Sequence, residues 1–220
     1  MRRLLIVGAG GHGVVVADAA EASQEWSQII FIDDAYPGVG KVEEWDVLGD
    51  NSALQRLRKD IDAVVVAVGN NDVRMNLLAD VAEAAIPLAK IIHPRASVSR
   101  LSEIGSGTVL LANAVVNARA VVGRGCIINT AATVDHDCRL ADGVHVAPGA
   151  NLAADVSVGE RSWIGAGATV REQIAIGSEV VIGVGAAVIR DVDDGLVVAG
   201  VPARPIQSEA RLRIMRNPSR

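Results

Sequence analysis

Aliphatic residues recur at every sixth position through the C-terminal half of the chain. The series runs without an insertion from Val98 to Val188, and all sixteen of its members are Val, Ile or Leu. A second series, of mostly small residues, precedes the first by two positions, as Ala114 precedes Val116. Because strand side chains alternate between two faces, both series point inward and the residue between them points outward. The other three residues of each hexad must turn the chain.

A period of six predicts a coil of very short strands. Such strands can bury their inner faces only if each coil stacks on the one before it, and this period is typical of hexapeptide β-helices. A helix would need a 3.6-residue periodicity, which residues 98–188 lack. We therefore expect an all-β parallel β-helix over residues 93–205.

Residues 1–92 follow a different pattern, in which apolar runs alternate with helix-like segments. The apolar runs lie at residues 4–7, 29–32 and 63–68, and a helix-like stretch extends from residue 14 to about residue 23. Two more helices, of about 9 and 14 residues, fill the remaining gaps. The alternation predicts a small α/β domain with a Rossmann-like βαβαβ parallel sheet.

A glycine-rich turn joins the first strand to the first helix. Gly8, Gly10 and Gly13 match the pattern GxGxxG, and Asp33 follows 20 residues later, the spacing of an acid that binds a ribose hydroxyl. Glycines let the backbone approach a phosphate, and the helix N-terminus favours its charge. The domain has room for only half of a dinucleotide site, so we expect a mononucleotide ligand. The alternative is that the glycines serve only the tight turn.

Composition narrows the classes of function. Lys and Arg number 21 against 26 Asp and Glu, and the net charge of −5 offers no positive surface for nucleic acid. No apolar stretch approaches the roughly 18 residues of a membrane span, and the run after Arg2-Arg3 lacks a signal-peptide cleavage pattern. We expect a cytoplasmic protein without a nucleic-acid or membrane partner. Residues 206–220 form a basic C-terminal tail.

Cysteine and histidine are scarce. Cys126 and Cys138 are too few for a disulfide framework and form no CxxC motif, so we expect small buried side chains. The β-helix repeats hold only His136 and His145, which argues against a three-histidine zinc centre, and we expect no metal. His145 lies between two inward valines, so it should face outward in mid-strand, toward a ligand or solvent.

His136 is the strongest candidate for chemistry. It falls in a turn of its hexad and is flanked by Asp135 and Asp137, so it is not a core histidine. Imidazole, with a pKa near 6.5, can accept a proton from an attacking group at physiological pH.

The order and spacing of several short motifs resemble one family along nearly the whole chain. The motifs are Gly-Ala-Gly-Gly-His-Gly at 8–13, Phe-Ile-Asp-Asp at 31–34, Gly-Asn-Asn at 69–71, Ile-His-Pro at 92–94, Asn-Thr at 129–130, Asp-His-Asp-Cys at 135–138, Gly-Val-His-Val at 143–146, Pro-Gly at 148–149 and Gly-Val-Pro-Ala at 200–203. They resemble the two-domain bacterial acetyltransferases of nucleotide-linked amino sugars, of the bacillosamine and perosamine type, and the related sialic acid O-acetyltransferases. The resemblance implies a triangular, left-handed β-helix with three hexads per coil.

The resemblance also implies roles for individual residues. His136 would be the general base and Asp137, where sugar-modifying members often carry Glu, would raise its basicity. The resemblance implies that acetyl-CoA contacts Asn129, His145 and the backbone around Ala166 and Val184. It implies that the sugar nucleotide contacts Gly10, Gly11, His12, Asp33, Asp34 and Gly69.

These inferences predict an enzyme that moves an acetyl group from acetyl-CoA to the amine of a nucleotide-linked amino-deoxy sugar. The resemblance implies a homotrimer with acetyl-CoA in the groove between subunits, and outer aliphatics such as Leu111 and Val181 favour such contacts. One alternative is O-acetylation of sialic acid or a related sugar. Another is a nucleotide-binding structural or regulatory protein.

Overall fold

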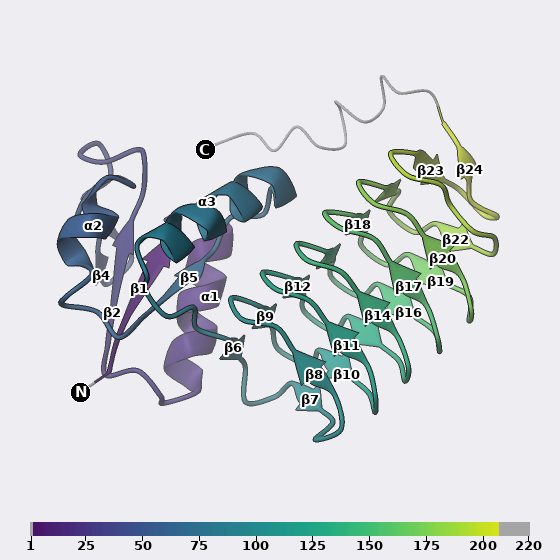
Figure 1. Cartoon of the computed structure of the whole chain (residues 1–220), viewed down its shortest axis with the longest axis horizontal. Helices are drawn as coiled ribbons and strands as arrows, with labels where there is room; N and C mark the ends of the chain where they lie inside the picture. Colours follow the sequence, from purple (N-terminus) through teal and green to yellow (C-terminus); the bar gives the residue numbers. More distant parts are fainter. Residues whose placement is uncertain (1, 207–220) are drawn as a thin grey trace.

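A small α/β domain is followed by a parallel β-helix in the computed structural model, which describes residues 2–206 (Figure 1). Except for Ile206, the expected basic tail lies outside the described residues. The elements of the small domain are β1 (Arg3–Val7), α1 (Gly11–Ala22), β2 (Gln28–Ile32), β3 (Lys41–Val42), β4 (Trp45–Asp46), α2 (Ala53–Leu57), β5 (Ala63–Val66) and α3 (Asn71–Glu83).

The three main strands of the small domain form the expected parallel sheet, in the order β2-β1-β5. Alternate residues of β1 face opposite sides: Leu4 and Ile6 pack with α1, whereas Leu5 and Val7 pack with α2 and α3. α2 is shorter than the nine residues expected. It ends because the backbone N–H of Asp60 bonds to the carbonyl of Leu57 and closes a turn.

The β-helix has three flat sides, each a parallel sheet of two-residue strands. Only sheet III ends differently, with the three-residue β23 and the antiparallel β24. Sheet I contains β7 (Ser97–Val98), β10 (Val115–Val116), β13 (Thr133–Val134), β16 (Asn151–Leu152), β19 (Thr169–Val170) and β22 (Ala187–Val188). Sheet II contains β8 (Glu103–Ile104), β11 (Val121–Val122), β14 (Arg139–Leu140), β17 (Ser157–Val158) and β20 (Ala175–Ile176). Sheet III contains β6 (Ile91–Ile92), β9 (Val109–Leu110), β12 (Ile127–Ile128), β15 (His145–Val146), β18 (Trp163–Ile164), β21 (Val181–Ile182), β23 (Val197–Ala199) and the antiparallel β24 (Arg204–Pro205).

Paired strands along the repeat are 18 residues apart, as Val116 pairs with Val134, so three hexads make one coil as expected. The structure adds β6 before the sequence repeat and β23 after it. The chain passes three corners in each coil, which we call the I–II, II–III and III–I corners after the sheets that they join.

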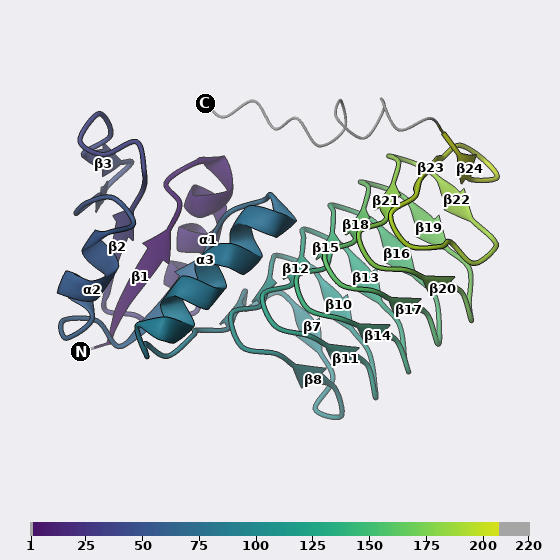
Figure 2. The ribbon, with the colours of Figure 1, turned by 45° about the horizontal axis from the view of Figure 1, so that its top comes forward.

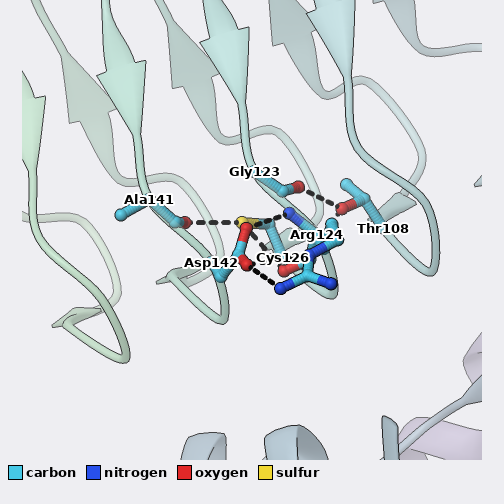
Figure 3. A network of polar contacts seen from close by, with 6 residues as sticks. All are labelled: Thr108, Gly123, Arg124, Cys126, Ala141 and Asp142. Carbon is cyan, nitrogen blue, oxygen red and sulfur yellow. Dashed lines mark hydrogen bonds and ion pairs between the residues drawn. The ribbon is translucent and has the colours of Figure 1, made fainter. Parts of the chain in front are cut away.

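Small inward residues satisfy the backbone at the II–III corner (Figure 3). The Thr108 hydroxyl donates to the carbonyl of Gly123 at 2.8 Å and accepts from the backbone N–H of Cys126. The Cys126 thiol in turn approaches the carbonyl of Ala141 at 3.2 Å. Both cysteines are free and fully buried, as expected, and burial raises the pKa of Cys126 to about 12.

The small domain covers the beginning of the β-helix (Figures 1 and 2). Leu111 packs in one apolar cluster with α1 and the small sheet and is only 1% exposed. Val181 is also 1% exposed in the single chain. These two aliphatics therefore provide no apolar outer surface for a second subunit, contrary to their reading from the sequence.

None of the helices formed by residues 2–206 combines the length and the apolar character needed to cross a bilayer. Over the same residues, no group of three or more His, Cys, Asp or Glu side chains is arranged to hold a metal ion.

Candidate active site

His136 and Asp137 form a hydrogen-bonded pair at the I–II corner, between β13 and β14. Asp137 has a left-handed φ of +61°, and its Oδ2 lies 2.7 Å from Nδ1 of His136. Asp135 holds the other side of the turn by accepting from the His136 backbone N–H at 2.7 Å. A carboxylate can only accept, so Nδ1 carries the proton and the neutral ring has its lone pair on Nε2. The His136 side chain is half exposed, and Nε2 can take a proton from a substrate.

Arg119 binds the same carboxylate from the coil below. Its Nε and Nη2 donate to the two oxygens of Asp137 at 2.6 and 2.7 Å. The two residues are 18 apart and share a left-handed backbone, so they occupy equivalent corner positions in successive coils. Hydrogen bonds from Arg119, and then from His136, hold the pKa of Asp137 well below its usual range. The carboxylate therefore remains charged in the folded chain at neutral pH.

The pair lies in a hollow on the outer surface of the β-helix. Its lining is His136, Asp137, Arg139, Ala154, Asp155, Glu172 and Gln173. All seven come from the I–II corner and β14 in three successive coils, so the small domain contributes nothing to this hollow.

The glycine turn of the small domain has two kinds of glycine. Gly8 has a φ of +106°, and a Cβ at Gly13 would collide with the carbonyl oxygen of Gly8, so the fold itself requires both. A Cβ at Gly10, Gly11 or Gly69 would meet nothing within 4 Å. These three glycines leave open space beside the N-terminus of α1, which is compatible with the expected phosphate contact.

The two predicted aspartates lie beside this turn, but the carboxylate of each has a partner within the chain. Asp33 accepts from the backbone N–H groups of Ala9 and Ala35 at 2.7 and 2.8 Å. Asp34 accepts from Asn51 at 3.4 Å. Asp33 therefore fixes the glycine turn, a role that the ribose-binding spacing did not suggest, and its oxygens retain further acceptor capacity.

His145 faces outward from β15, but the small domain covers it. His145 is only 9% exposed. Of the two alternatives expected from the sequence, a ligand or solvent, the structure therefore contradicts solvent. Asn129 points its amide nitrogen at Nε2 of His145 at 3.1 Å, because its Oδ1 accepts from the backbone N–H of Thr130. Nε2 must therefore accept, and the neutral ring carries its proton on Nδ1, which is buried. Nδ1 makes no well-formed hydrogen bond among residues 2–206, although the backbone of Gly69 lies close enough to influence the ring.

His12, at the start of α1, adjoins the same region. Its Nε2 is also buried, with no hydrogen-bond partner in the described part of the chain. Burial, and then the charge of Arg74, lowers the pKa of His12 to about 4. The same two causes, followed by His12, lower the pKa of His145 to about 3. Both imidazoles are neutral at pH 7.

Ala166 and Val184 lie on a third surface, at the III–I corner. Val184 is 70% exposed. Gly149, Gly167 and Gly185 share this corner in successive coils, and a Cβ on any of them would meet nothing within 4 Å. The corner therefore presents bare backbone, as expected for a groove that binds its ligand through the main chain.

The single chain does not bring all the predicted site residues together. His12, Gly69, Asn129 and His145 lie on or near sheet III, where the small domain docks, whereas His136 occupies the corner between the other two sheets. A sugar nucleotide at the glycine turn and a base at His136 of the same chain would lie on different sides of the β-helix.

Sequence reasoning missed Arg119 and Arg74. The 18-residue coil could have revealed Arg119, because it lies one coil before Asp137. Arg74 carried no comparable signal, since two of its partners, Gly125 and Gly143, come from the β-helix and depend on how the domains dock.

Comparison with known families and proteins gives consistent matches. Residues 3–81 match the family model of the PglD N-terminal domain. UDP-N-acetylbacillosamine N-acetyltransferase of Bacillus subtilis is 40% identical over 114 residues, which are 51% of this chain and 52% of that protein. This match thus spans about half the length of the curated relative.

Two solved structures match over almost the whole chain. The acetyltransferase domain of PglB from Neisseria gonorrhoeae, in complex with acetyl coenzyme A, is 44% identical with a TM-score of 0.90, covering 93% of this chain and 99% of that one. A variant of perosamine N-acetyltransferase from Caulobacter crescentus, in complex with CoA and GDP-perosamine, is 35% identical with a TM-score of 0.91, covering 94% and 98%.

Proposed function

The chain belongs to the family of sugar N-acetyltransferases that includes the bacillosamine and perosamine enzymes, and from this we propose that it acetylates a nucleotide-linked amino-deoxy sugar. The acetyl donor is acetyl-CoA, and the acceptor is the amine of a sugar of the UDP-4-amino-4,6-dideoxyhexose type. The observation that carries the proposal is the His136–Asp137 pair, whose imidazole has one nitrogen fixed and the other free.

In the proposed reaction the sugar amine attacks the carbonyl carbon of the acetyl thioester. His136 Nε2 accepts the proton that the nitrogen loses, and Asp137 stabilises the imidazolium that results. The bond between the carbonyl carbon and sulfur then breaks, and the coenzyme A thiolate leaves and takes up a proton. A positioned base of this kind contributes roughly 10²–10⁴-fold in rate.

We place the two substrates on separate surfaces. The open glycines Gly10, Gly11 and Gly69, with His12, would bind the sugar nucleotide together with Asp33 and Asp34. The bare III–I corner at Ala166 and Val184, with Asn129 and His145, would bind acetyl-CoA.

The separation of His136 from the small domain supports a homotrimer. A second copy could bring its I–II corner to the glycine turn of the first, so that each site would take its base from a neighbour. Closed rings of this kind repeat one heterologous contact. Sedimentation of the full chain at micromolar concentration tests this: a trimer supports the shared site, and a stable monomer that is active contradicts it. The free, buried cysteines fit a reducing compartment, and we propose the cytoplasm.

Thiol release from acetyl-CoA tests the activity. The full chain is mixed with a panel of nucleotide-linked 4-amino sugars carrying UDP, GDP or dTDP, with sialic acid as the O-acetylation control. We expect stoichiometric coenzyme A and an N-acetylated product with at least one amino sugar. Turnover of sialic acid that UDP does not inhibit would favour the O-acetyltransferase alternative, and no thiol release with any acceptor would overturn the proposed function.

A further inference from the structure

Arg74, on α3, is the largest fully buried side chain of the described residues and is 1% exposed. All five of its N–H groups have acceptors. Nε donates to the carbonyl of Gly125 at 2.7 Å, and Nη1 donates to Val68 and Gly69 at 2.9 and 3.2 Å. Nη2 donates to Oδ1 of Asn71 at 2.7 Å and to the carbonyl of Gly143 at 2.8 Å.

These bonds cross the contact between the two domains, which we call the seam (Gly69, Asn71 and Arg74 of the small domain; Gly125, Gly143 and His145 of the β-helix). Val68 and Gly69 belong to the loop that leads into α3, and Asn71 is the first residue of that helix. Gly125 and Gly143 belong to the II–III corners of successive coils, two residues before β12 and β15. One guanidinium therefore fixes a loop of the small domain against two coils.

None of the five acceptors is a carboxylate. A buried cation is expensive unless it is paired or fully hydrogen-bonded, and here neutral acceptors replace the usual counterion. Asp72 acts on Arg74 only through space, and it is exposed, 3.8 Å from Arg161. The Cys126 thiol is protonated and contributes no negative charge at neutral pH. The pKa of Arg74 is lowered by burial to about 10, so the side chain remains charged.

The uncompensated charge acts on the two neutral histidines of the seam region. Arg74 is the second cause of the low pKa of both His12 and His145, after burial. The charged or titratable groups that act on these rings are Arg74 from α3, which acts on both, and His12 from α1, which acts on His145. A neutral imidazole can both donate and accept a hydrogen bond, whereas the protonated ring can only donate.

We propose that Arg74 is a positioning residue that holds the Gly69 loop and the strand of His145 in one fixed arrangement, with its charge directed at His12 and His145. The inference rests on the proposed function, because Gly69 belongs to the proposed sugar-nucleotide site and His145 to the proposed acetyl-CoA site. It goes further by assigning the coupling between these two sites to one side chain that touches neither substrate.

The test compares three variants of the full chain. Arg74→Met removes the charge and all five hydrogen bonds, and Arg74→Lys keeps the charge but not the planar fork. Leu78→Ala is the control: Leu78 packs from the same helix on the corner glycines Gly107 and Gly125, so its loss loosens the seam and leaves Arg74 in place. NMR titration of His12 and His145 is combined with kcat and both KM values.

We expect Arg74→Met to raise the pKa of both histidines by about one unit or more. Both KM values should rise about tenfold with kcat changed less than about threefold, because uniform binding is lost while His136 lies at a different corner. Arg74→Lys should raise both KM values but leave both histidine pKa values unchanged, because the positive charge remains. Leu78→Ala should lower the melting temperature without raising either histidine pKa.

Equal rises of the histidine pKa values in Leu78→Ala and Arg74→Met would overturn the inference, because loosening alone would explain them. Unchanged KM values in a folded Arg74→Lys protein would also overturn it, and this variant decides the matter if Arg74→Met does not fold. The NMR titration needs no turnover. A parent chain that acetylates nothing would therefore defeat the proposed function while the titration still decides the electrostatic role of Arg74.

Discussion

The seam and the I–II corner each combine an arginine with histidine, yet they treat the histidine in opposite ways. At the seam Arg74 is buried among neutral acceptors, and burial followed by the Arg74 charge lowers the pKa of both His12 and His145. At the I–II corner Arg119 and His136 share the carboxylate of Asp137 and remain half exposed or more. One environment buries neutral imidazoles near a cation, and the other exposes an imidazole that is hydrogen-bonded to a carboxylate.

The difference suits two different tasks. A general base must gain and lose a proton in each turnover, so it needs solvent access and a nearby negative charge. A group that binds uncharged parts of a substrate must keep one protonation state, and burial beside a cation ensures this. The same side chain can therefore serve both tasks in one protein, because its surroundings decide which one it performs.

The largest expected effect is at the exposed histidine. His136→Ala removes the proton acceptor and should lower kcat by about 10²–10⁴-fold, with little change in the KM for acetyl-CoA. Thiol release at saturating sugar measures it, and circular dichroism should show an intact β-helix. A near-normal kcat in this variant, on an acceptor that the parent acetylates well, would mean that His136 is not the base.

The buried histidines should instead govern stability in acid. Their pKa values fall from 6.5 in the unfolded chain to about 4 for His12 and about 3 for His145 in the folded chain. Between about pH 6.5 and pH 4 the unfolded chain binds more protons, so stability is full above this window and is lost as the pH falls through it.

The slope should approach about 1.4 kcal/mol per pH unit for each histidine. Urea unfolding at several pH values measures it. His12→Gln or His145→Gln should each reduce the slope. A slope that neither buried variant reduces would remove the electrostatic contrast between the two regions.

Asp137→Asn keeps the size of the side chain but removes its charge. The protonated form of His136 loses its stabilising partner, so the acidic limb of the pH–rate profile should move to lower pH. The loss in kcat should be smaller than in His136→Ala, about tenfold, because the base itself remains. A pH profile that does not move would show that the carboxylate only orients the ring.

The smallest effect should follow the loss of Arg119. In Arg119→Met the Asp137 carboxylate no longer pairs with an arginine and interacts with His136 alone. The acidic limb of the pH–rate profile should therefore move to higher pH, by less than about one unit at this exposed site. The matched control is Arg124→Met, since Arg124 also pairs with an aspartate of the next coil, Asp142 at 2.7 Å, but that carboxylate has no histidine partner among the described residues. The shift should also vanish in the Asp137→Asn background, and its persistence there would point to another cause.

Local patterns in the sequence determined the repeat. The six-residue period was enough to predict the parallel β-helix, and the apolar runs predicted the small parallel sheet. The turn position of His136 and its pairing with an adjacent aspartate are local, so they too were accessible from the sequence. Such features depend on neighbours within one strand or turn. The 18-residue step between coils was expected from the family resemblance, and the strand pairing shows it.

Only the tertiary structure decided how the outer faces are used. The pattern marked both Leu111 and His145 as outward positions, and it could not tell that the small domain covers them. The covering depends on contacts such as Arg74 to Gly125, 51 residues apart, and Asn71 to Arg161, 90 residues apart. No periodicity encodes these contacts, because they arise from the shapes and hydrogen-bonding groups that two finished domains present to each other.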